Sequence, residues 1–369
     1  MMQSNSKHEG SPTERPKLLL SGLDSLYVSY FLDTSAGKLD WDDLAYRKER
    51  IRHSRNDVHT EIVCGTERFA LLPYGRKPYS YVLTNKSFEI RLAEHMRPNC
   101  HVQIFSEALW KSGADFTLAR IEEWFRSIKF VHTRPNVVSR ADWAFDYHLP
   151  FIDFAWDDFV SVAEKENSWR KHRKAETFTF GVGDPVIRVY DKAAEINQES
   201  GKTWFHELWA RKDKVWRIEF QARRKRLDLA GIDSTADIGC VQGDLLRELA
   251  QRHTTLRVPN GDSNRSRWPL HRLWQALLDD IAALPQTGLV RDLDPLAPID
   301  WRLHQLTKSL YGTLKAIAAL RQIKSDAPEP LSLDNLLVLL SKILPSHHDA
   351  VVWKQEVARR VADYGLGRW

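Results

Sequence analysis

Cysteine is scarce in this chain. Three cysteines occur in 369 residues, at Cys64, Cys100 and Cys240. They form no Cys-x-x-Cys pair and show no zinc-ligand spacing, and an odd number of distant cysteines does not make a disulfide framework. The sequence therefore excludes a disulfide-stapled secreted scaffold and a zinc finger, and it predicts reduced thiols.

Long apolar runs are lacking as well. No segment approaches the roughly 18 apolar residues that a membrane-spanning helix needs. Residues 1–16 are polar and lack the apolar stretch of a signal peptide, so we expect a disordered tail there. These absences predict a cytoplasmic protein with no membrane partner.

Charge of one sign is not in large excess either. The chain has 54 Lys and Arg against 49 Asp and Glu, a net charge of +5, so only the placement of the charges can indicate nucleic acid. What is abundant is tryptophan, with 14 residues, which anchors cores and also offers surfaces on which bases stack. The length and a hydrophobic content of 43% allow two domains.

The first two thirds of the chain read as strands with few helices. Between 18 and 106 the apolar alternation predicts short strands, with hairpins at 65–66 and 84–86. Helices are expected at 117–128 and 157–165. Further strands are expected at 137–147, 176–180, 186–192 and 215–223. A parallel doubly wound sheet would need a helix after nearly every strand, so this pattern predicts an α+β domain on an antiparallel sheet over 17–258.

The last third has helical periodicity instead. A linker-like stretch at 261–267 precedes Pro269, which opens a helix. Leucines from Leu303 to Leu320 step by three or four, and Ser332 is placed to cap a further helix. A last helix is expected over 350–364. The sequence therefore predicts an α+β antiparallel core with flanking helices, followed by an all-helical region over 267–369.

Three of the expected strands carry polar residues at a spacing of two. Alternate residues of a strand lie on one face of a sheet, so each set should share a face. The sets are Arg140, Asp142 and Asp146; Arg188, Tyr190 and Lys192; and Arg217, Glu219, Gln221 and Arg223. A sheet with one solvated face also alternates charges, so the spacing alone does not separate a catalytic surface from a merely wet one.

Together the three sets contain what a tyrosine needs in order to cleave a phosphodiester. The phenol of Tyr190 is a poor nucleophile near neutral pH, and Arg188 and Lys192 can stabilise charge around it. A divalent cation could polarise the phosphate, and oxygen ligands suit Mg2+ or Mn2+. Its candidate ligands are Asp142, Asp146 and Glu219.

In this order and at this separation, the three segments resemble the replication initiation factor family. They read Arg-x-Asp-x-x-x-Asp, Ile-Arg-Val-Tyr-Asp-Lys-x-x-Glu and Trp-Arg-x-Glu-x-Gln-x-Arg. That family includes rolling-circle initiators of plasmids, replication proteins of filamentous phages and relaxases of conjugative elements. The similarity spans 18–231 and is strongest over 140–226.

The resemblance implies a nicking and closing endonuclease. Tyr190 would attack one strand at an origin, leaving a 5′-phosphotyrosyl intermediate and a free 3′-hydroxyl, and the strand would later be rejoined. Two alternatives stay open: a conjugative relaxase with the same chemistry, and a non-catalytic origin-binding or repressor protein of the same fold. Implied partners are double- and single-stranded origin DNA. The C-terminal helices are candidates for origin recognition, host helicase recruitment or homodimerisation.

Tyr147 is the rival nucleophile, because it directly follows Asp146. Strand alternation places it on the opposite face from the acids, so we rank it below Tyr190. None of the 14 histidines forms a histidine-hydrophobe-histidine metal motif. The segment 181–183 lacks a following Lys-Ser or Lys-Thr and predicts a hairpin turn instead of a phosphate loop.

Clustered basic residues supply candidate DNA contacts. Lysine and arginine neutralise backbone phosphates, although any one basic run can equally be a solvated loop. The candidates are Arg140, Arg217 and Arg223 on the shared face; Arg170, Lys171, Arg173 and Lys174 beside Trp169; and Arg224, Lys225 and Arg226 after the third strand.

Overall fold

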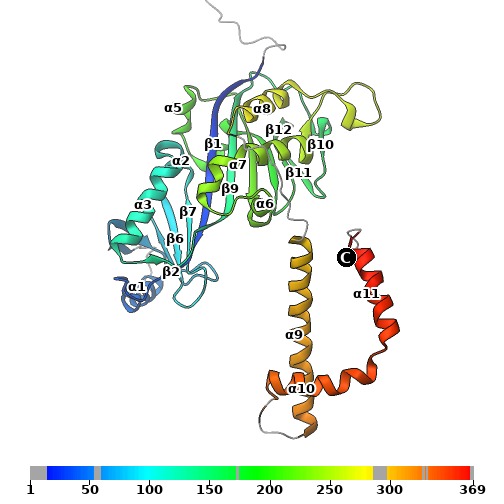
Figure 1. Cartoon of the computed structure of the whole chain (residues 1–369). Helices are drawn as coiled ribbons and strands as arrows, with labels where there is room; N and C mark the ends of the chain where they lie inside the picture. Colours follow the sequence, from blue (N-terminus) through cyan, green and yellow to red (C-terminus); the bar gives the residue numbers. More distant parts are fainter. Residues whose placement is uncertain are drawn as a thin grey trace, which may run out of the picture. The chain divides into compact units, whose positions relative to one another are not determined.

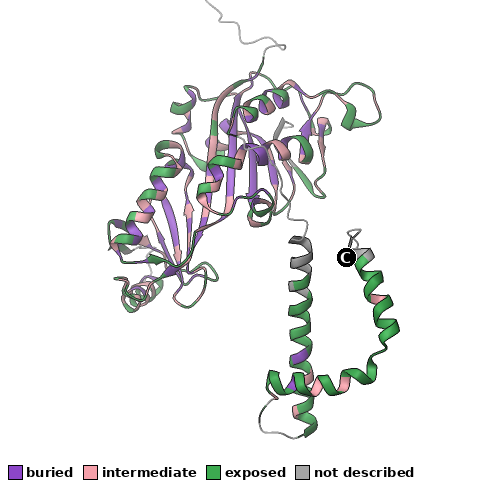
Figure 2. Ribbon diagram, in the orientation of Figure 1, coloured by how far each residue is buried: buried purple, intermediate pink, exposed green. Residues whose placement is uncertain are grey.

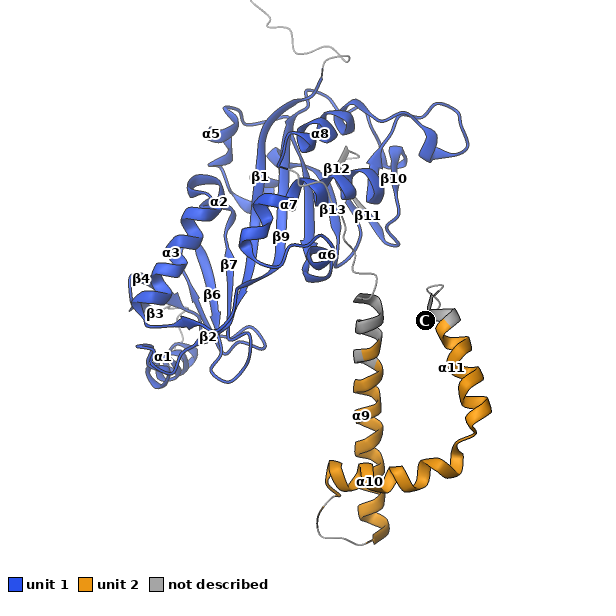
Figure 3. Ribbon diagram, viewed as in Figure 1, with its two compact units in different colours: residues 1–290 blue, residues 291–369 orange. Residues whose placement is uncertain are grey.

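The structure is a computed structural model. It describes residues 15–53, 60–171, 174–285, 297–325, 329 and 331–365. The chain divides into two compact units, Met1–Val290 and Arg291–Trp369 (Figure 3). Most of the expected N-terminal tail, residues 1–14, lies outside the described residues.

The first unit is built on an eleven-stranded sheet, in the order β11-β12-β13-β14-β9-β1-β7-β6-β5-β4-β3 (Figure 1). Every neighbouring pair is antiparallel. The strands are β1 (Lys17–Tyr30), β3 (Thr60–Cys64), β4 (Glu67–Leu71), β5 (Tyr81–Thr84), β6 (Phe88–Leu92), β7 (Cys100–Ile104), β9 (Val137–His148), β11 (Glu166–Lys171), β12 (Lys174–Phe180), β13 (Val186–Asp191) and β14 (Val215–Arg223). Two small pairs accompany it: β2 (Leu32–Asp33) with β8 (Val131–His132), and β10 (Phe159–Ser161) with β15 (Thr254–Leu256).

Helices connect several of these strands along the chain. They are α1 (Trp41–His53), α2 (Ser106–Ser112), α3 (Ala114–Ser127), α4 (Lys192–Glu195), α5 (Phe205–Trp209), α6 (Arg224–Leu229), α7 (Thr235–Glu248) and α8 (Arg272–Ala282). Short 3-10 or π segments are η1 (Trp156–Asp158), η2 (Ile196–Ser200), η3 (Leu249–His253) and η4 (Arg265–Arg267).

One face of the sheet carries the main core. Alternate side chains of β14, namely Trp216, Ile218 and Phe220, are buried there with at most 4% exposed. Helices α3, α7 and α8 cover this face: Trp124 of α3 packs edge-on against Phe69, and α7 and α8 make polar contacts to β9. Figure 2 shows the buried strands beneath these helices. We call this the helix-covered face.

The opposite face is covered at one end by helices. There α2, α4 and α5 pack on the sheet around a second apolar cluster, which includes Ile196, Phe205, Trp209 and Val215. The Trp110 and Phe205 rings lie 6.0 Å apart in this cluster. We call these three helices the cap, and the face on which they sit the open face.

The α+β fold class expected from the sequence is confirmed, as are both hairpins in the first third. The helix expected at 157–165 is wrong. That segment forms η1 and β10, because Phe159 is buried between the rings of Phe178 and Phe180 and pairs with Leu256. Tertiary burial outweighs the local helical pattern there.

The division between the units also differs from the expected boundary at 258–267. The helical periodicity places α8 in the C-terminal region, but in the structure this helix belongs to the first unit. Its Leu273, Trp274, Leu277 and Ile281 are fully buried in the main core. An amphipathic helix is stabilised by whichever surface covers its apolar side, which periodicity alone does not identify.

The second unit consists of α9 (Ala297–Ser325), α10 (Leu333–Ile343), η5 (Leu344–His347) and α11 (Ala350–Gly365). Ser332 caps α10 as expected, since its side chain accepts a hydrogen bond from the backbone of Asn335. Leu314 and Leu336 are buried, whereas other large apolar side chains are exposed, among them Trp353 at 63%. In the described parts of the chain, no helix combines the length and apolarity needed to cross a membrane.

Candidate active site

The three motif strands are neighbours in the sheet. β14 lies between β13 and β9, and the register aligns Tyr190 with Arg217 and Arg217 with Asp146. Their polar residues therefore lie on the open face, next to the cap. The site is thus formed by residues far apart in sequence that antiparallel pairing aligns in rows across the strands.

Tyr190 makes one hydrogen bond to a carboxylate. Its Oη donates to Oε2 of Glu219 at 3.0 Å, and Nη1 of Arg188 donates to the other oxygen of Glu219 at 2.7 Å. Tyr190 is buried, with 9% of its surface exposed. Burial, reinforced by the charge of Glu219, raises the pKa of Tyr190 well above its ordinary value. The phenol is therefore protonated, and Glu219 is the base within reach of its proton.

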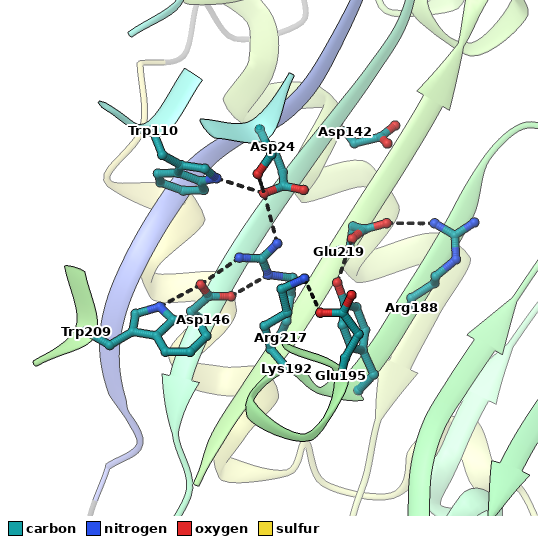
Figure 4. Close-up of polar contacts among 12 residues, drawn as sticks. Asp24, Trp110, Asp142, Asp146, Arg188, Lys192, Glu195, Trp209, Arg217 and Glu219 are labelled. Carbon is teal, nitrogen blue, oxygen red and sulfur yellow. Dashed lines mark hydrogen bonds and ion pairs between the residues drawn. The ribbon is translucent and has the colours of Figure 1, made fainter. Parts of the chain in front are cut away.

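Arg217 holds the centre of the site together. Its Nε and Nη2 donate to the two oxygens of Asp146 at 2.6 and 2.8 Å, and its Nη1 donates to Asp24 at 2.9 Å (Figure 4). The side chain is fully buried. Arg217 therefore positions carboxylates, and the structure differs here from its sequence-based assignment as a DNA contact.

Two indole groups complete this buried network. Nε1 of Trp209 donates to Asp146 at 2.9 Å, and Nε1 of Trp110 donates to Asp24 at 2.8 Å (Figure 4). Burial raises the pKa of Asp24, but the charges of Arg217, Lys202 and Lys192 and the hydrogen bond from Trp110 together outweigh burial and hold the pKa well below the usual range. Asp24 is therefore ionised, and the network ties the cap helices α2 and α5 to the sheet.

Lys192 lies at the start of α4, directly after β13. Asp191 caps this helix by accepting a hydrogen bond from the backbone of Ala194. Nζ of Lys192 donates to Glu195 and lies 5.6 Å from the centre of the Tyr190 ring. Burial, followed by the charge of Arg217, lowers the pKa of Lys192. The ammonium group thus lies beside the tyrosine ring, held by Glu195.

The predicted metal ligands do not form one cluster. Among the described residues, no group of three or more His, Cys, Asp or Glu side chains is arranged to hold a metal ion. Asp146 does not fit as a ligand, because it is fully buried and both its oxygens accept from Arg217, which is fully buried as well. Asp146 is therefore removed from the three metal ligands that the sequence predicts.

Asp142 and Glu219 are the two carboxylates that remain. Asp142 is also buried and accepts from Nε and Nη2 of Arg140 at its two oxygens, but Arg140, unlike Arg217, is partly exposed. Burial raises the pKa of Asp142 to about 6, although the hydrogen bonds from Arg140 lower it. The nearby charge of Glu219 adds to the rise. Two carboxylates on one face supply the oxygen donors that Mg2+ and Mn2+ prefer, although their oxygens already accept hydrogen bonds from Arg140, Arg188 and Tyr190.

Sequence reasoning missed Asp24, Trp110, Trp209 and Glu195. Asp24 lies at a register shift between β1 and β9, at Leu23 and Ser25, so regular alternation along the strand does not reveal it. Glu195 was visible as the last residue of the tyrosine motif, three residues after Lys192. The two tryptophans come from cap helices that the sequence pattern did not resolve.

The predicted DNA contacts fall into three groups. Arg223 and Lys225 are exposed, and Arg140 is partly exposed. Arg224 donates to the backbone oxygens of Val138 and Ile232, and Arg226 pairs with Glu248, so both make structural contacts. Arg173 lies outside the described residues, as do the side chains of Arg170, Lys171 and Lys174.

Tyr147, the rival nucleophile, lies on the helix-covered face as expected. It is fully buried, and its Oη donates to Asp280 of α8 at 2.7 Å. Its hydroxyl is thus separated from the acids of the open face by the thickness of the sheet.

Comparison with known proteins adds little information about function. No family model matches the chain, and no curated protein matches it. One similar solved structure is the rolling circle replication initiator protein from Geobacillus stearothermophilus, with 18% sequence identity over 72% of this chain and 97% of that chain, and a TM-score of 0.43. A likeness of this degree carries no argument about function, which has to rest on the side chains described above.

Proposed function

We propose that this chain is a DNA-nicking enzyme of the rolling-circle initiator type, with Tyr190 as the nucleophile. The observation that carries the proposal is the hydrogen bond from Tyr190 to Glu219, whose other oxygen is held by Arg188. A nucleophile, a base and a residue that orients the base are the parts that covalent catalysis requires. The resemblance of the three motif segments to the replication initiation factor family supports the same residues.

The proposed step follows from these contacts. Glu219 accepts the phenol proton as Oη of Tyr190 forms a bond to the phosphorus of one DNA strand. The bond from phosphorus to the 3′-oxygen breaks, and that oxygen leaves as a hydroxyl after taking up a proton from solvent. The positive charges of Arg188 and Lys192 stabilise the negative charge that develops around the phosphate. The reverse of this step rejoins the strand.

A divalent cation would be held by Asp142 and Glu219. When bound, Mg2+ or Mn2+ would supply a Lewis acid for the phosphate oxygens. Isothermal titration of MnCl2 into the protein should give heat of binding that is lost in Asp142→Asn. Equal binding by the variant would overturn the assignment of Asp142, and the nicking proposal would be unaffected.

The proposal is tested with a supercoiled plasmid that carries the gene of this chain and its flanking DNA. With Mg2+ or Mn2+ present, the wild-type protein should produce nicked circles with protein attached to a 5′ end after denaturation. Peptide mass spectrometry should place the nucleotide on Tyr190. Tyr190→Phe should form no adduct.

Tyr147→Phe is the matched control, because it removes a hydroxyl from the same sheet but from the helix-covered face. It should form the adduct as the wild type does. An adduct that persists in Tyr190→Phe contradicts the assignment of the nucleophile. DNA binding by the wild type without any adduct favours the non-catalytic origin-binding alternative. Replication initiation and conjugative transfer need the same nick, so this experiment does not distinguish them.

A further inference from the structure

The open face continues well beyond Tyr190. The cap closes the end of the face next to Tyr190, where Trp209 and Phe205 are buried. In the other direction along the strands, successive rows carry Glu219, then Gln221 with Asp142, then Arg223 with Arg140. A DNA strand bound at Tyr190 therefore has a polar surface to follow in the direction away from the cap.

The Arg223–Arg140 row crosses the middle of the sheet and includes an aromatic residue. Arg140 pairs in register with Arg223 on β14 and with Tyr27 on β1, and Tyr27 pairs with Gln103 on β7. Arg217 and Arg223 are six residues apart on β14, so this row lies ~20 Å along the strands from that of Tyr190. That separation corresponds to a few nucleotides of extended single strand.

Tyr27 has the surroundings of a stacking platform. The Arg140 guanidinium lies over its ring, 5.0 Å from the centre, and the His101 ring lies 6.0 Å away at a tilt of 53°. Tyr27, Arg140 and His101 are each only partly buried. Arginine planes and aromatic rings are the groups on which bases of single strands stack, with little dependence on sequence.

The charges around Tyr27 favour a polyanion. The charged groups that act on its hydroxyl are three arginines, Arg140, Arg91 and Arg223, against one acid, Asp142. Arg91 donates to Gln103 of the same row at 3.1 Å and to Glu89 at 2.6 Å. His101 is neutral near pH 7, because burial lowers its pKa to about 4. The platform therefore combines flat rings with an excess of positive charge.

We propose that Tyr27, backed by Arg140 and His101, is a base-stacking subsite for the single-stranded DNA whose phosphate is attacked by Tyr190. The subsite holds the strand a few nucleotides from the point of cleavage and so fixes the register of the scissile phosphate. This inference rests on the proposed function, since it names where the same substrate is held.

The experiment measures binding of fluorescein-labelled oligodeoxythymidine of about 20 nucleotides to the full-length chain by fluorescence anisotropy. Tyr27→Leu removes the aromatic face but keeps an apolar side chain, and it should weaken binding about 5- to 150-fold, the range that corresponds to the loss of one base stack. Tyr27→Phe keeps the ring and should bind within about threefold of the wild type. Tyr46→Leu, which changes an exposed tyrosine of α1, should bind as the wild type does.

Photo-crosslinking covers the case in which Tyr27→Leu does not fold. Wild-type protein irradiated with an oligonucleotide containing 5-iodouridine should give a crosslinked peptide from β1 that contains Tyr27. Unchanged binding by folded Tyr27→Leu, or crosslinks that all map away from β1, would overturn the subsite.

The two proposals fail in different ways. An error about the nucleophile appears in adduct formation, which the binding and crosslinking experiments do not measure. An error about the subsite appears only in binding and crosslinking.

Discussion

At the scale of single residues, the most constrained charge is that of Arg217. It is fully buried, and it donates three hydrogen bonds to Asp146 and Asp24. Burial lowers its pKa, but the two carboxylates outweigh this and hold the guanidinium charged at any ordinary pH. The chain thus keeps a complete ion network beneath the candidate nucleophile, where its loss would leave charges without partners.

Arg217→Met should therefore lower the free energy of unfolding by about 3–5 kcal/mol, because Asp146 is left buried and unpaired. Urea unfolding followed by tryptophan fluorescence measures this change. Arg223→Met is the control, since Arg223 lies on the same strand but is exposed, and it should change the free energy by less than about 0.5 kcal/mol. A change below about 1 kcal/mol for Arg217→Met would contradict the role assigned to the network.

His101 should make stability depend on pH. Its pKa is lowered to about 4 by burial and by the charge of Arg91, and Nδ1 has no hydrogen-bond partner within the described residues. An unfolded histidine has a pKa of about 6.5. Above that pH neither state is protonated. As the pH falls from about 6.5 towards 4, only the unfolded state gains a proton, so stability is lost over that window.

His101→Gln should remove this part of the pH dependence. The free energy of unfolding of the wild type should fall by about 2 kcal/mol more than that of the variant between pH 7 and pH 4.5. Denaturant unfolding at a series of pH values measures the difference. Parallel curves for the two proteins would show that His101 titrates normally in the folded state.

At the scale of elements, the hairpin between β3 and β4 depends on Gly65. Its φ is +58°, and a Cβ there would lie 2.8 Å from Cγ2 of Ile128 and against Ser127. Ser127 cannot easily move, since its Oγ accepts a hydrogen bond from Thr66 and donates one to Trp124. The glycine thus allows the hairpin to lie directly against the end of α3.

Gly65→Ala should lower the thermal stability more than Gly201→Ala. Gly201 has a similar φ of +63° but open space around it, so its alanine variant carries only the backbone strain of about 1–2 kcal/mol. The Gly65 variant adds the steric overlap, which typically costs about 1–3 kcal/mol more. Equal losses of thermal stability in the two variants, measured by calorimetry, would show that α3 shifts to accommodate the alanine without destabilising the fold.

At the scale of the whole molecule, α8 decides where the first unit ends. Its four fully buried apolar side chains each contribute about 1.5–3 kcal/mol by burial, together comparable to the whole stability of a typical domain. Trp274 also donates to the backbone oxygen of Ala250 at 2.7 Å. The helix is therefore part of the core and does not merely lead into the second unit.

A chain ending at residue 290 should unfold cooperatively in urea with a midpoint near that of the first unit in the full chain. A chain ending at residue 266 lacks α8 and should be degraded rapidly in limited proteolysis. If the shorter chain resists protease as well as the longer one, the boundary expected from the sequence near 258–267 is the better description.

The sequence by itself determined which side chains share a face of a strand. Alternation is a local property, so the positions of Arg188, Tyr190 and Glu219 on one side could be predicted, and Tyr147 could be placed on the other side. The hairpins at 65–66 and 84–86 followed from turn residues, which are also local. The fold class followed from the density of strands.

Only the tertiary structure decided which of these side chains are available for chemistry. Arg217 and Asp146 look like their neighbours in sequence, yet they neutralise each other in the interior, because strand order places them opposite one another beneath the cap. Asp24 joins them through a register shift, and α8 joins the first unit because its apolar side faces the sheet. Pairing partners and burial depend on contacts between distant segments, which no local pattern encodes.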